Sequence, residues 1–563
     1  MGFFKKVANK SASVVVLLIT LTIFSNYLFV STRTTLWDRD EPRYARAAVE
    51  MVESGNYLLP TFNGQIWFDK PPLLYWLMSL PIRLKGPTEL ACRFFGVLGT
   101  ALICLLTYFI GKQLLGTKAG LWAMVILAST LMILIVGTSA ISDAVLLPFI
   151  VAVMAVFAQS ISSRVPLSHI FLMGVALGLG MLTKGPIGLM PLPAIATILW
   201  LVRKTRKNIW RDVCAVAASL AIGFLIFAAW AIPANHFTDG QFLREFIGRH
   251  VITRALKPME HHGGNFLLYL PYYLPVVIVG LFPWTLHLPG AISAVIGGRV
   301  GGKYGRIFLI SWVVPTFIIM SLAATKLPHY IIFIWPALAL AVAGTIVAEQ
   351  ENRLTERDKI WLRRGVWFFG PLAIAMALGL MVGPWFVKIP GLRWSGLASG
   401  MVLLAMAIIA IHQQRANRPQ AAAKVLLVCI LVFEISVLFG ILSAVEQVKI
   451  APALARAVND KTVKDVPVAA YKYREPTLNF YIGRHIEVLR TEKDVVDWAE
   501  RAINGILVIP RNDLTEIQRR YGELPLDKLI SKHGFDYSKG KELDVVALTR
   551  RPVPSEVEGM DKQ

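Results

Sequence analysis

Long apolar runs alternate with short charged gaps over most of the chain. The first run, residues 11–31, is long enough to cross the roughly 30 Å hydrocarbon core of a bilayer as a helix. Similar runs recur as far as residue 444 and predict about thirteen spans. Their expected ranges are 11–31, 90–111, 119–137, 144–160, 168–183, 187–202, 213–232, 270–289, 306–324, 330–348, 366–386, 395–412 and 424–444. The pattern therefore predicts a polytopic α-helical membrane protein.

Two parts of the chain depart from this pattern. Residues 71–85 are apolar but short, and Pro81 interrupts them, so we expect an interfacial or re-entrant helix there. Beyond the last apolar run, polar residues mix with short β-type runs and two helix-like segments. The sequence thus predicts a membrane domain over 1–445 and a small soluble α/β domain over 446–563. The second domain has no obvious catalytic motif, and capping the membrane domain is its favoured role.

Composition and charge agree with a membrane protein. Hydrophobic residues make up 55% of the 563 residues and charged residues only 17%, which excludes a soluble globule. The formal net charge of +22 falls largely in alternating short loops, among them 299–306 and 353–364, where Lys and Arg mark the cytoplasmic side. This alternation predicts a cytoplasmic N-terminus and an outer C-terminal domain. No motif for nucleic-acid binding accompanies the charge, so nucleic acid is not an expected partner.

A cluster of charged residues follows the first span. Ionisable groups near lipid are costly and usually mark a site. The carboxylates Asp40 and Glu41 are the candidate catalytic groups, and Arg43 and Tyr44 are candidate substrate contacts. Asp40 could instead serve only as the N-cap of a helix with Pro42 in its first turn. That helix has an apolar face and is expected to lie on the membrane.

Further candidates lie at other outer ends of spans. Asp69 and Lys70 precede two prolines, which fix an extended backbone. Lys70 could bind a lipid phosphate as a point charge, or it could be a lysine that only snorkels towards water. Asp143 and Lys184 follow on the same predicted side, and Lys184 could equally be an anchor at the membrane interface.

The outer loop 233–269 holds the densest outer cluster of cations, which suits a phosphate or diphosphate. Its adjacent histidines, His261 and His262, could hold a divalent metal with outer carboxylates, but no metal ligand is assigned. The candidate substrate contacts in this loop and at the end of a later span are His250, Arg254, His262, Lys326, His329 and Tyr330. Together with the loop 32–89, these positions predict one site on the outer face.

Four of the motifs, taken together, resemble a known group of enzymes. They are residues 37–44, 68–76, 182–186 and 325–330. The chain is similar in these motifs to the GT-C glycosyltransferases that use polyprenyl-phosphate sugars. Among them it most resembles the lipid A aminoarabinose transferase family, with the protein O-mannosyltransferases as more distant relatives.

The resemblance implies an inverting glycosyltransferase of the bacterial inner membrane with a periplasmic site. It would move aminoarabinose or a related sugar from undecaprenyl phosphate to lipid A or another envelope acceptor. Asp40 would match the family's essential carboxylate, and Lys70, Arg254 and Lys326 would hold the donor phosphate. Asp69 stands where the nearest relatives often have Glu.

Other functions remain open at this point. A transporter or flippase of a lipid-linked sugar would also need many spans and a cationic cavity. Transporters are commonly built from two related halves, and the sequence has no clear internal repeat. A GT-C enzyme that glycosylates a protein or another glycan, and a non-catalytic assembly protein, are the remaining alternatives.

Overall fold

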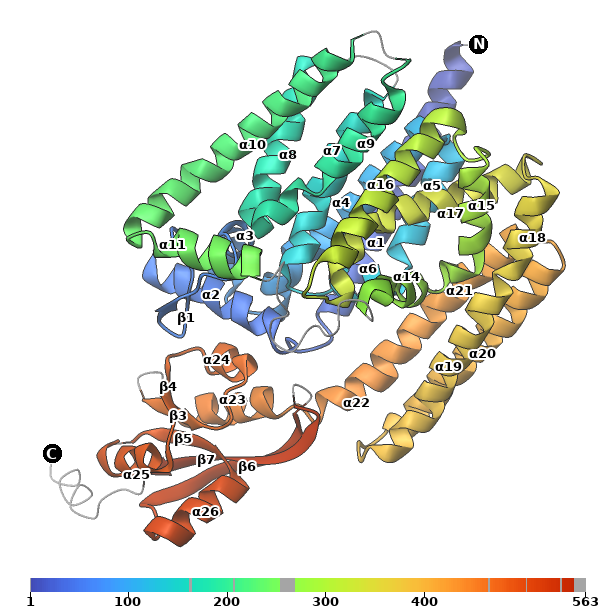
Figure 1. The fold of residues 1–563 in the computed structure, drawn as a ribbon. Helices are drawn as coiled ribbons and strands as arrows, with labels where there is room; N and C mark the ends of the chain where they lie inside the picture. Colours follow the sequence, from blue (N-terminus) through green and yellow to red (C-terminus); the bar gives the residue numbers. More distant parts are fainter. Residues whose placement is uncertain are drawn as a thin grey trace.

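A computed structural model describes residues 2–161, 165–205, 208–253, 269–463, 466–502, 504–536 and 539–550, with the backbone alone for 2–12 and 249–252. Figure 1 shows a bundle of long helices with a smaller mixed domain at one end. The N-terminus lies at the end of the bundle away from that domain.

Ten helices among the described residues are long and apolar enough to cross a membrane. They are Ser13–Ser31 within α1 (Gly2–Ser31), α4 (Glu89–Leu114), α7 (Ser142–Gln159), α8 (Leu167–Lys184) with η1 (Gly185–Leu189), α10 (Ile209–Phe237), α16 (Gly302–Leu322), η5 (Pro328–Ile334) with α17 (Trp335–Gln350), α18 (Glu356–Arg364) with α19 (Val366–Val382) and η6 (Gly383–Phe386), α20 (Leu392–Arg415), and α21 (Pro419–Ser436) with η7 (Val437–Leu442) and α22 (Ser443–Glu446). The prediction of a polytopic helical protein is confirmed.

Three of the expected spans are less regular. The helices α5 (Thr117–Ala128) and α6 (Leu131–Gly137) meet at a bend of 64°. The segments Leu270–Gly280 and Trp284–Ile296 meet at 110°, so that up to twelve spans result if each bent pair counts as one. The short helix α9 (Pro191–Val202) occupies the remaining predicted position but has only 12 residues.

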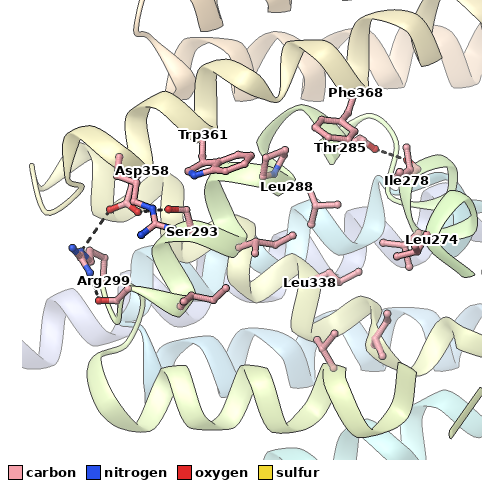
Figure 2. Close-up of a pocket in the computed structure, with 18 of the residues that line it drawn as sticks. Leu274, Ile278, Thr285, Leu288, Ser293, Arg299, Leu338, Asp358, Trp361 and Phe368 are labelled. Carbon is pink, nitrogen blue, oxygen red and sulfur yellow. Dashed lines mark hydrogen bonds and ion pairs between the residues drawn. The ribbon is translucent and has the colours of Figure 1, made fainter. Parts of the chain in front are cut away.

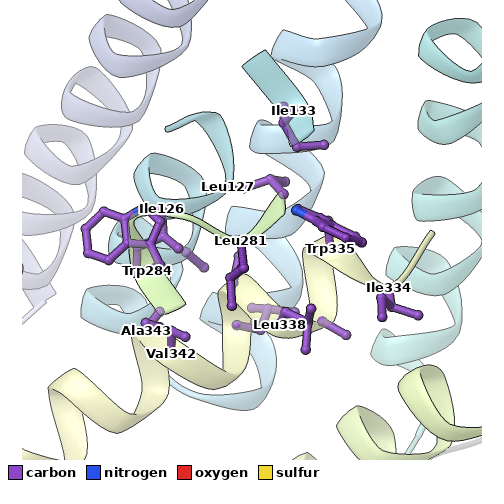
Figure 3. Packing of buried hydrophobic residues seen from close by; sticks show 14 of the residues in the cluster. Ile126, Leu127, Ile133, Leu281, Trp284, Ile334, Trp335, Leu338, Val342 and Ala343 are labelled. Atoms are coloured by element: carbon purple, nitrogen blue, oxygen red, sulfur yellow. The ribbon is translucent and has the colours of Figure 1, made fainter. Parts of the chain in front are cut away.

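Two tryptophans fill the sharper bend, as Figure 3 shows. This bend separates α14 (Tyr273–Gly280) from η4 (Trp284–His287) and α15 (Leu288–Ile296). The indole Nε1 of Trp284 donates to the hydroxyl of Ser129 at 2.9 Å, and that of Trp335 donates to the carbonyl of Gly280 at 3.3 Å. Broken helices persist inside a membrane protein where such partners and packing satisfy the freed backbone.

The helix α4 lies at the centre of the first half of the bundle. It begins after Thr88, whose hydroxyl accepts a hydrogen bond from the amide of Ala91 and so caps the helix. A Cβ at Gly99 would lie 2.7 Å from the carbonyl oxygen of Ala144, so glycine lets α4 approach α7 closely. This close packing fixes the start of α7 against α4.

The C-terminal domain contains a five-stranded sheet in the order β4-β3-β5-β7-β6. The strands are β3 (Val468–Tyr471), β4 (Ile486–Leu489), β5 (Ile506–Pro510), β6 (Leu526–Asp536) and β7 (Lys541–Arg550). β3 pairs in parallel with β4 and β5, and β7 pairs antiparallel with β5 and β6. The helices α23 (Ile450–Lys461) and α24 (Pro476–Ile482) pack on one face, and α25 (Glu492–Arg501) and α26 (Arg511–Tyr521) pack on the other. The predicted small α/β domain is therefore present.

The helix after the first span differs from its prediction. Ten of the 15 residues of α2 (Asp40–Ser54) are buried. The helix lies between α3 (Leu73–Lys85), which is the short helix expected over 71–85, and α24 of the C-terminal domain. The helix has the expected apolar face, and its other face is covered as well, because the C-terminal domain packs on it through α24.

A buried ion pair fixes the segment between α1 and α2. Arg93 of α4 donates to the two carboxylate oxygens of Glu41 at 2.8 and 2.6 Å. The same guanidinium donates to the carbonyls of Ser31, Thr34 and Thr35 at 2.6, 2.7 and 3.1 Å. The side chains of Arg93 and Glu41 are only 1% and 3% exposed, so the whole turn is held by groups shielded from water.

We predict that Arg93→Met destabilises the protein by about 3–5 kcal/mol, because it leaves the Glu41 charge buried without a partner. The measurement is thermal unfolding of the purified protein in detergent. A matched control is Lys359→Met, which removes an exposed ion pair with Glu356 and should change stability by at most about 1 kcal/mol. Equal melting temperatures for the two variants would contradict this role of Arg93.

Candidate functional site

A polar cavity of 440 Å³ opens at the end of the bundle that faces the C-terminal domain. It contains nine of the fourteen residues proposed from the sequence. The residues that line it are Arg39, Asp40, Arg43, Tyr44, Trp67, Asp69, Lys70, Ile141, Ser142, Asp143, Lys184, Leu327, His329 and Tyr330. Four cations and three carboxylates thus share one cavity, which leaves a formal excess of one positive charge with neutral histidine. Such a site suits an anionic ligand.

Helix ends bring these side chains together. Asp40 lies in the first turn of α2 and Asp143 in the first turn of α7, where the helix dipole favours negative charge. Lys184 is the last residue of α8, where the dipole favours positive charge. The alternative in which Asp40 serves only as the N-cap of α2 is wrong, since Arg39 is the N-cap residue and no side chain makes a capping hydrogen bond.

Asp143 is the most strongly held carboxylate of the cavity. The ammonium of Lys184 lies 2.7 Å from each of its oxygens, and Nε2 of His329 lies 3.7 Å from one of them. Lys184 also lies 4.7 Å from the centre of the Tyr330 ring. The side chain of Lys184 is only 12% exposed, so its charge points into the cavity instead of anchoring the protein at an interface.

Asp69 forms a second pair with its neighbour Lys70. The ammonium of Lys70 lies 2.9 Å from the carboxylate of Asp69, and the hydroxyl of Tyr44 donates to the same carboxylate at 3.3 Å. The side chain of Lys70 is 9% exposed, which argues against a lysine that snorkels to water. Burial raises the pKa of Tyr44, which keeps its hydroxyl protonated as a donor.

Asp40 differs from these two carboxylates. Within the described residues it has neither a hydrogen bond nor an ion pair, and its side chain is exposed to the cavity. Arg39 and Arg43 likewise have no carboxylate partner in the described part of the chain, although Arg43 lies 5.7 Å from the Trp67 ring. The cavity therefore combines one unengaged carboxylate with two unengaged guanidinium groups.

Two predicted residues lie outside the cavity. The carboxylate of Glu41 binds Arg93 and accepts hydrogen bonds from the amides of Trp37 and Ala140 at 2.8 and 2.5 Å. Although burial opposes it, the charge of Arg93 holds the pKa of Glu41 below its usual value. Glu41 is thus placed as a structural anion behind the site. Lys326 donates to the carbonyls of Ser321 and Ala323 at 2.5 and 2.7 Å, which ends α16.

Three further predicted residues lie outside what the structure describes. Arg254 and His262 fall within 254–268, and the side chain of His250 is likewise not described, although its backbone continues η2 (Arg244–Thr253). In the remaining ranges no three His, Cys, Asp or Glu side chains converge as metal ligands would.

Sequence reasoning passed over two arginines. Arg39 lines the cavity and stands inside the charged cluster that drew attention to its neighbours. Arg93 is a single charge near the start of an apolar run, which is itself a signal of function or of a buried partner. Trp67 and Ser142 also line the cavity; Trp67 lies two residues before the candidate Asp69, and Ser142 directly precedes the candidate Asp143.

The C-terminal domain holds the chain just before Asp40. The amide and hydroxyl of Thr477 both donate to the carboxylate of Asp38, the amide at 2.9 Å. The hydroxyl of Tyr481 accepts from the amide of Leu36 at 2.8 Å and donates to Glu89 at 2.8 Å. Both residues belong to α24, so this helix fixes the chain segment that leads into the cavity.

The fold has a close counterpart among solved structures. ArnT from Cupriavidus metallidurans bound to undecaprenyl phosphate matches with a TM-score of 0.75 and 18% identity, over 95% of this chain and 97% of that one. The apo form of the same protein matches with a TM-score of 0.73. The sequence model of the dolichyl-phosphate-mannose-protein mannosyltransferase family matches residues 69–232. The chain therefore shares the polytopic membrane fold of ArnT.

Three curated relatives, all called undecaprenyl phosphate-α-4-amino-4-deoxy-L-arabinose arabinosyl transferase, narrow the class further. The protein from Pectobacterium carotovorum is 30% identical over 69% of this chain and 70% of its own length. The one from Aeromonas salmonicida is 30% identical over 67% of this chain and 68% of its own. The one from Edwardsiella ictaluri is 32% identical, and the match spans 62% of each protein. The chain belongs to this arabinosyl transferase family.

We predict that Asp38 makes stability depend on pH. Burial raises its pKa from 3.8 to about 6, against the hydrogen bonds of Thr477, which favour the ionised form. Between these values the folded protein keeps a proton that the unfolded chain has released, so stability falls as pH rises from about 4 to about 6. Asp38→Asn, which is neutral throughout, should lack this contribution.

The check is the melting temperature of both proteins at about pH 4.5 and about pH 7, compared as a difference so that other titrating groups cancel. Wild type should lose more stability than Asp38→Asn over this interval. Parallel pH profiles for the two proteins would contradict the assignment to Asp38.

Proposed function

We propose that the protein transfers 4-amino-4-deoxy-L-arabinose, or a closely related sugar, from undecaprenyl phosphate to lipid A or another envelope acceptor. Family membership supports the donor and the sugar. The observation that carries the proposal is a carboxylate, that of Asp40, with no partner among the described residues, in one cavity with Arg39 and Arg43, which have no carboxylate partner there. This is the arrangement that a base and a phosphate-binding group require.

The proposed setting is the bacterial inner membrane, with the cavity and the C-terminal domain in the periplasm. The alternation of basic loops supports this orientation. A polyprenyl-phosphate sugar presented at the outer surface would then reach the cavity from the membrane, and a lipid acceptor could approach along the same surface.

The donor phosphate would bind first to Arg39 and Arg43, because binding there breaks no ion pair of the described part of the chain. Lys70 would join them by exchanging Asp69 for the phosphate, at the cost of the 2.9 Å pair. As the glycosidic bond breaks, negative charge grows on the leaving phosphate, and preorganised cations stabilise that charge where catalysis gains most. Arg254, which the resemblance also assigns to the phosphate, would add to this group.

Asp40 would act on the acceptor. If the acceptor is a hydroxyl, Asp40 takes its proton while the oxygen attacks the anomeric carbon from the face opposite the phosphate, which inverts the configuration. If the acceptor is a lipid A phosphate, it is already nucleophilic, and Asp40 instead orients it or stabilises the cationic sugar. Glu41 would be a positioning group that holds the first turn of α2 through Arg93.

We predict that Asp40→Asn lowers the rate of transfer by about 100-fold or more, because the variant loses the carboxylate that acts as base for a hydroxyl acceptor, or that orients a phosphate acceptor or stabilises the cationic sugar. The first measurement is mass spectrometry of lipid A and other envelope glycolipids from cells that lack the gene and carry either wild type or the variant. An added mass the size of an aminopentose should return only with wild type.

The matched control is Asp497→Asn, an exposed position in α25 far from the cavity, which should restore the added mass fully. Restoration by Asp40→Asn would contradict the role given to Asp40. An added mass on another glycan, with lipid A unchanged, would identify that glycan as the acceptor and would not contradict the role given to Asp40.

A further inference from the structure

A second cavity of 700 Å³ lies within the helical bundle and has a mostly apolar lining. Figure 2 shows it between α14, α15, α17, α18 and α19, with Leu288, Leu338 and Phe368 around the same space. Residues from both sides of the 110° bend line it, so the broken helix creates the cavity. A volume of this size is within the range of ligand sites in proteins.

The apolar part suits a hydrocarbon chain. Thr285 could expose a hydroxyl there, but that hydroxyl donates to the carbonyl of Ile278 at 2.6 Å, which also satisfies the backbone at the bend. Ile292 and Ile296 are 50% and 55% exposed, so the cavity is open along α15, while Leu338 at its base is buried. In a membrane-spanning bundle, an opening of this kind faces lipid.

One end of the cavity is polar and basic. Asp358 accepts hydrogen bonds from the hydroxyls of Ser293 and Thr355 at 2.7 Å each and pairs with Arg299 at 3.6 Å. These groups satisfy one another. Arg357 lines the same end, is exposed, and has no ion pair within the described residues.

We propose that this cavity binds an anionic phospholipid, with one acyl chain in the apolar part and the headgroup phosphate at Arg357. The basic end lies between two segments, 299–306 and 353–364, which together carry eight Lys and Arg residues. Basic pockets between spans on the cytoplasmic side are suited to anionic headgroups. The cytoplasmic leaflet follows from the proposed orientation, whereas the binding itself does not depend on the transfer reaction.

The test uses the full-length protein in detergent and native mass spectrometry with phosphatidylglycerol or phosphatidylcholine of the same chain length. Wild type should retain phosphatidylglycerol in preference to phosphatidylcholine, and Arg357→Gln should reduce that preference by about fivefold. Ile292→Trp, which fills the opening, should reduce retention of both lipids. Arg415→Gln removes an exposed arginine of α20 outside the cavity and is the matched control.

Three results would overturn the proposal. Equal retention of the two lipids by wild type would contradict a preference for anionic headgroups. An Arg357→Gln variant no different from Arg415→Gln would contradict the contact between Arg357 and the phosphate. Retention of undecaprenyl phosphate by wild type in preference to phosphatidylglycerol, together with loss of that retention in Ile292→Trp, would assign the cavity to the donor instead. Because transfer is not measured, failure here leaves the proposed function untouched.

Discussion

The buried ion pair between Glu41 and Arg93 is the interaction on which the reaction cavity depends. One guanidinium holds the end of α1, the turn that follows it and the first turn of α2, while the carboxylate also binds the amide of Ala140 just before α7. Two charges removed from water are stable only when hydrogen bonds satisfy both, as they do here. The ion pair fixes the position of Asp40, which is the neighbour of Glu41. It also fixes the chain near Asp143, which lies three residues beyond Ala140.

The three carboxylates of the cavity differ in their partners. Asp143 and Asp69 are engaged by lysines, so they keep those cations in place and lower the net charge of the cavity. Asp40 has no such partner among the described residues and is left for chemistry. The C-terminal domain contributes through Thr477, which holds Asp38 two residues before Asp40, and this gives the domain a part in the site beyond capping.

The sequence alone predicts those features for which burying the wrong kind of residue in a membrane would cost much free energy. Apolar length identifies the spans, and charges at span ends are expensive enough that Asp40, Lys70, Asp143 and Lys184 could be selected without a structure. It could not separate Asp40 from Glu41, because adjacent helical residues point about 100° apart and only the position of α4 decides which one meets Arg93. Burial of α2 was missed for a similar reason, since α24 lies more than 400 residues along the chain.

The central claim is that the cavity around Asp40 holds the donor phosphate, and equilibrium binding of undecaprenyl phosphate to the purified protein tests it most directly. The double variant Arg39→Gln, Arg43→Gln should bind about tenfold or more weakly, since each charged hydrogen bond contributes about 1.5–3 kcal/mol. Lys359→Gln, an exposed cation outside the cavity, should bind as wild type does. Equal affinities for wild type and the double variant would contradict the account.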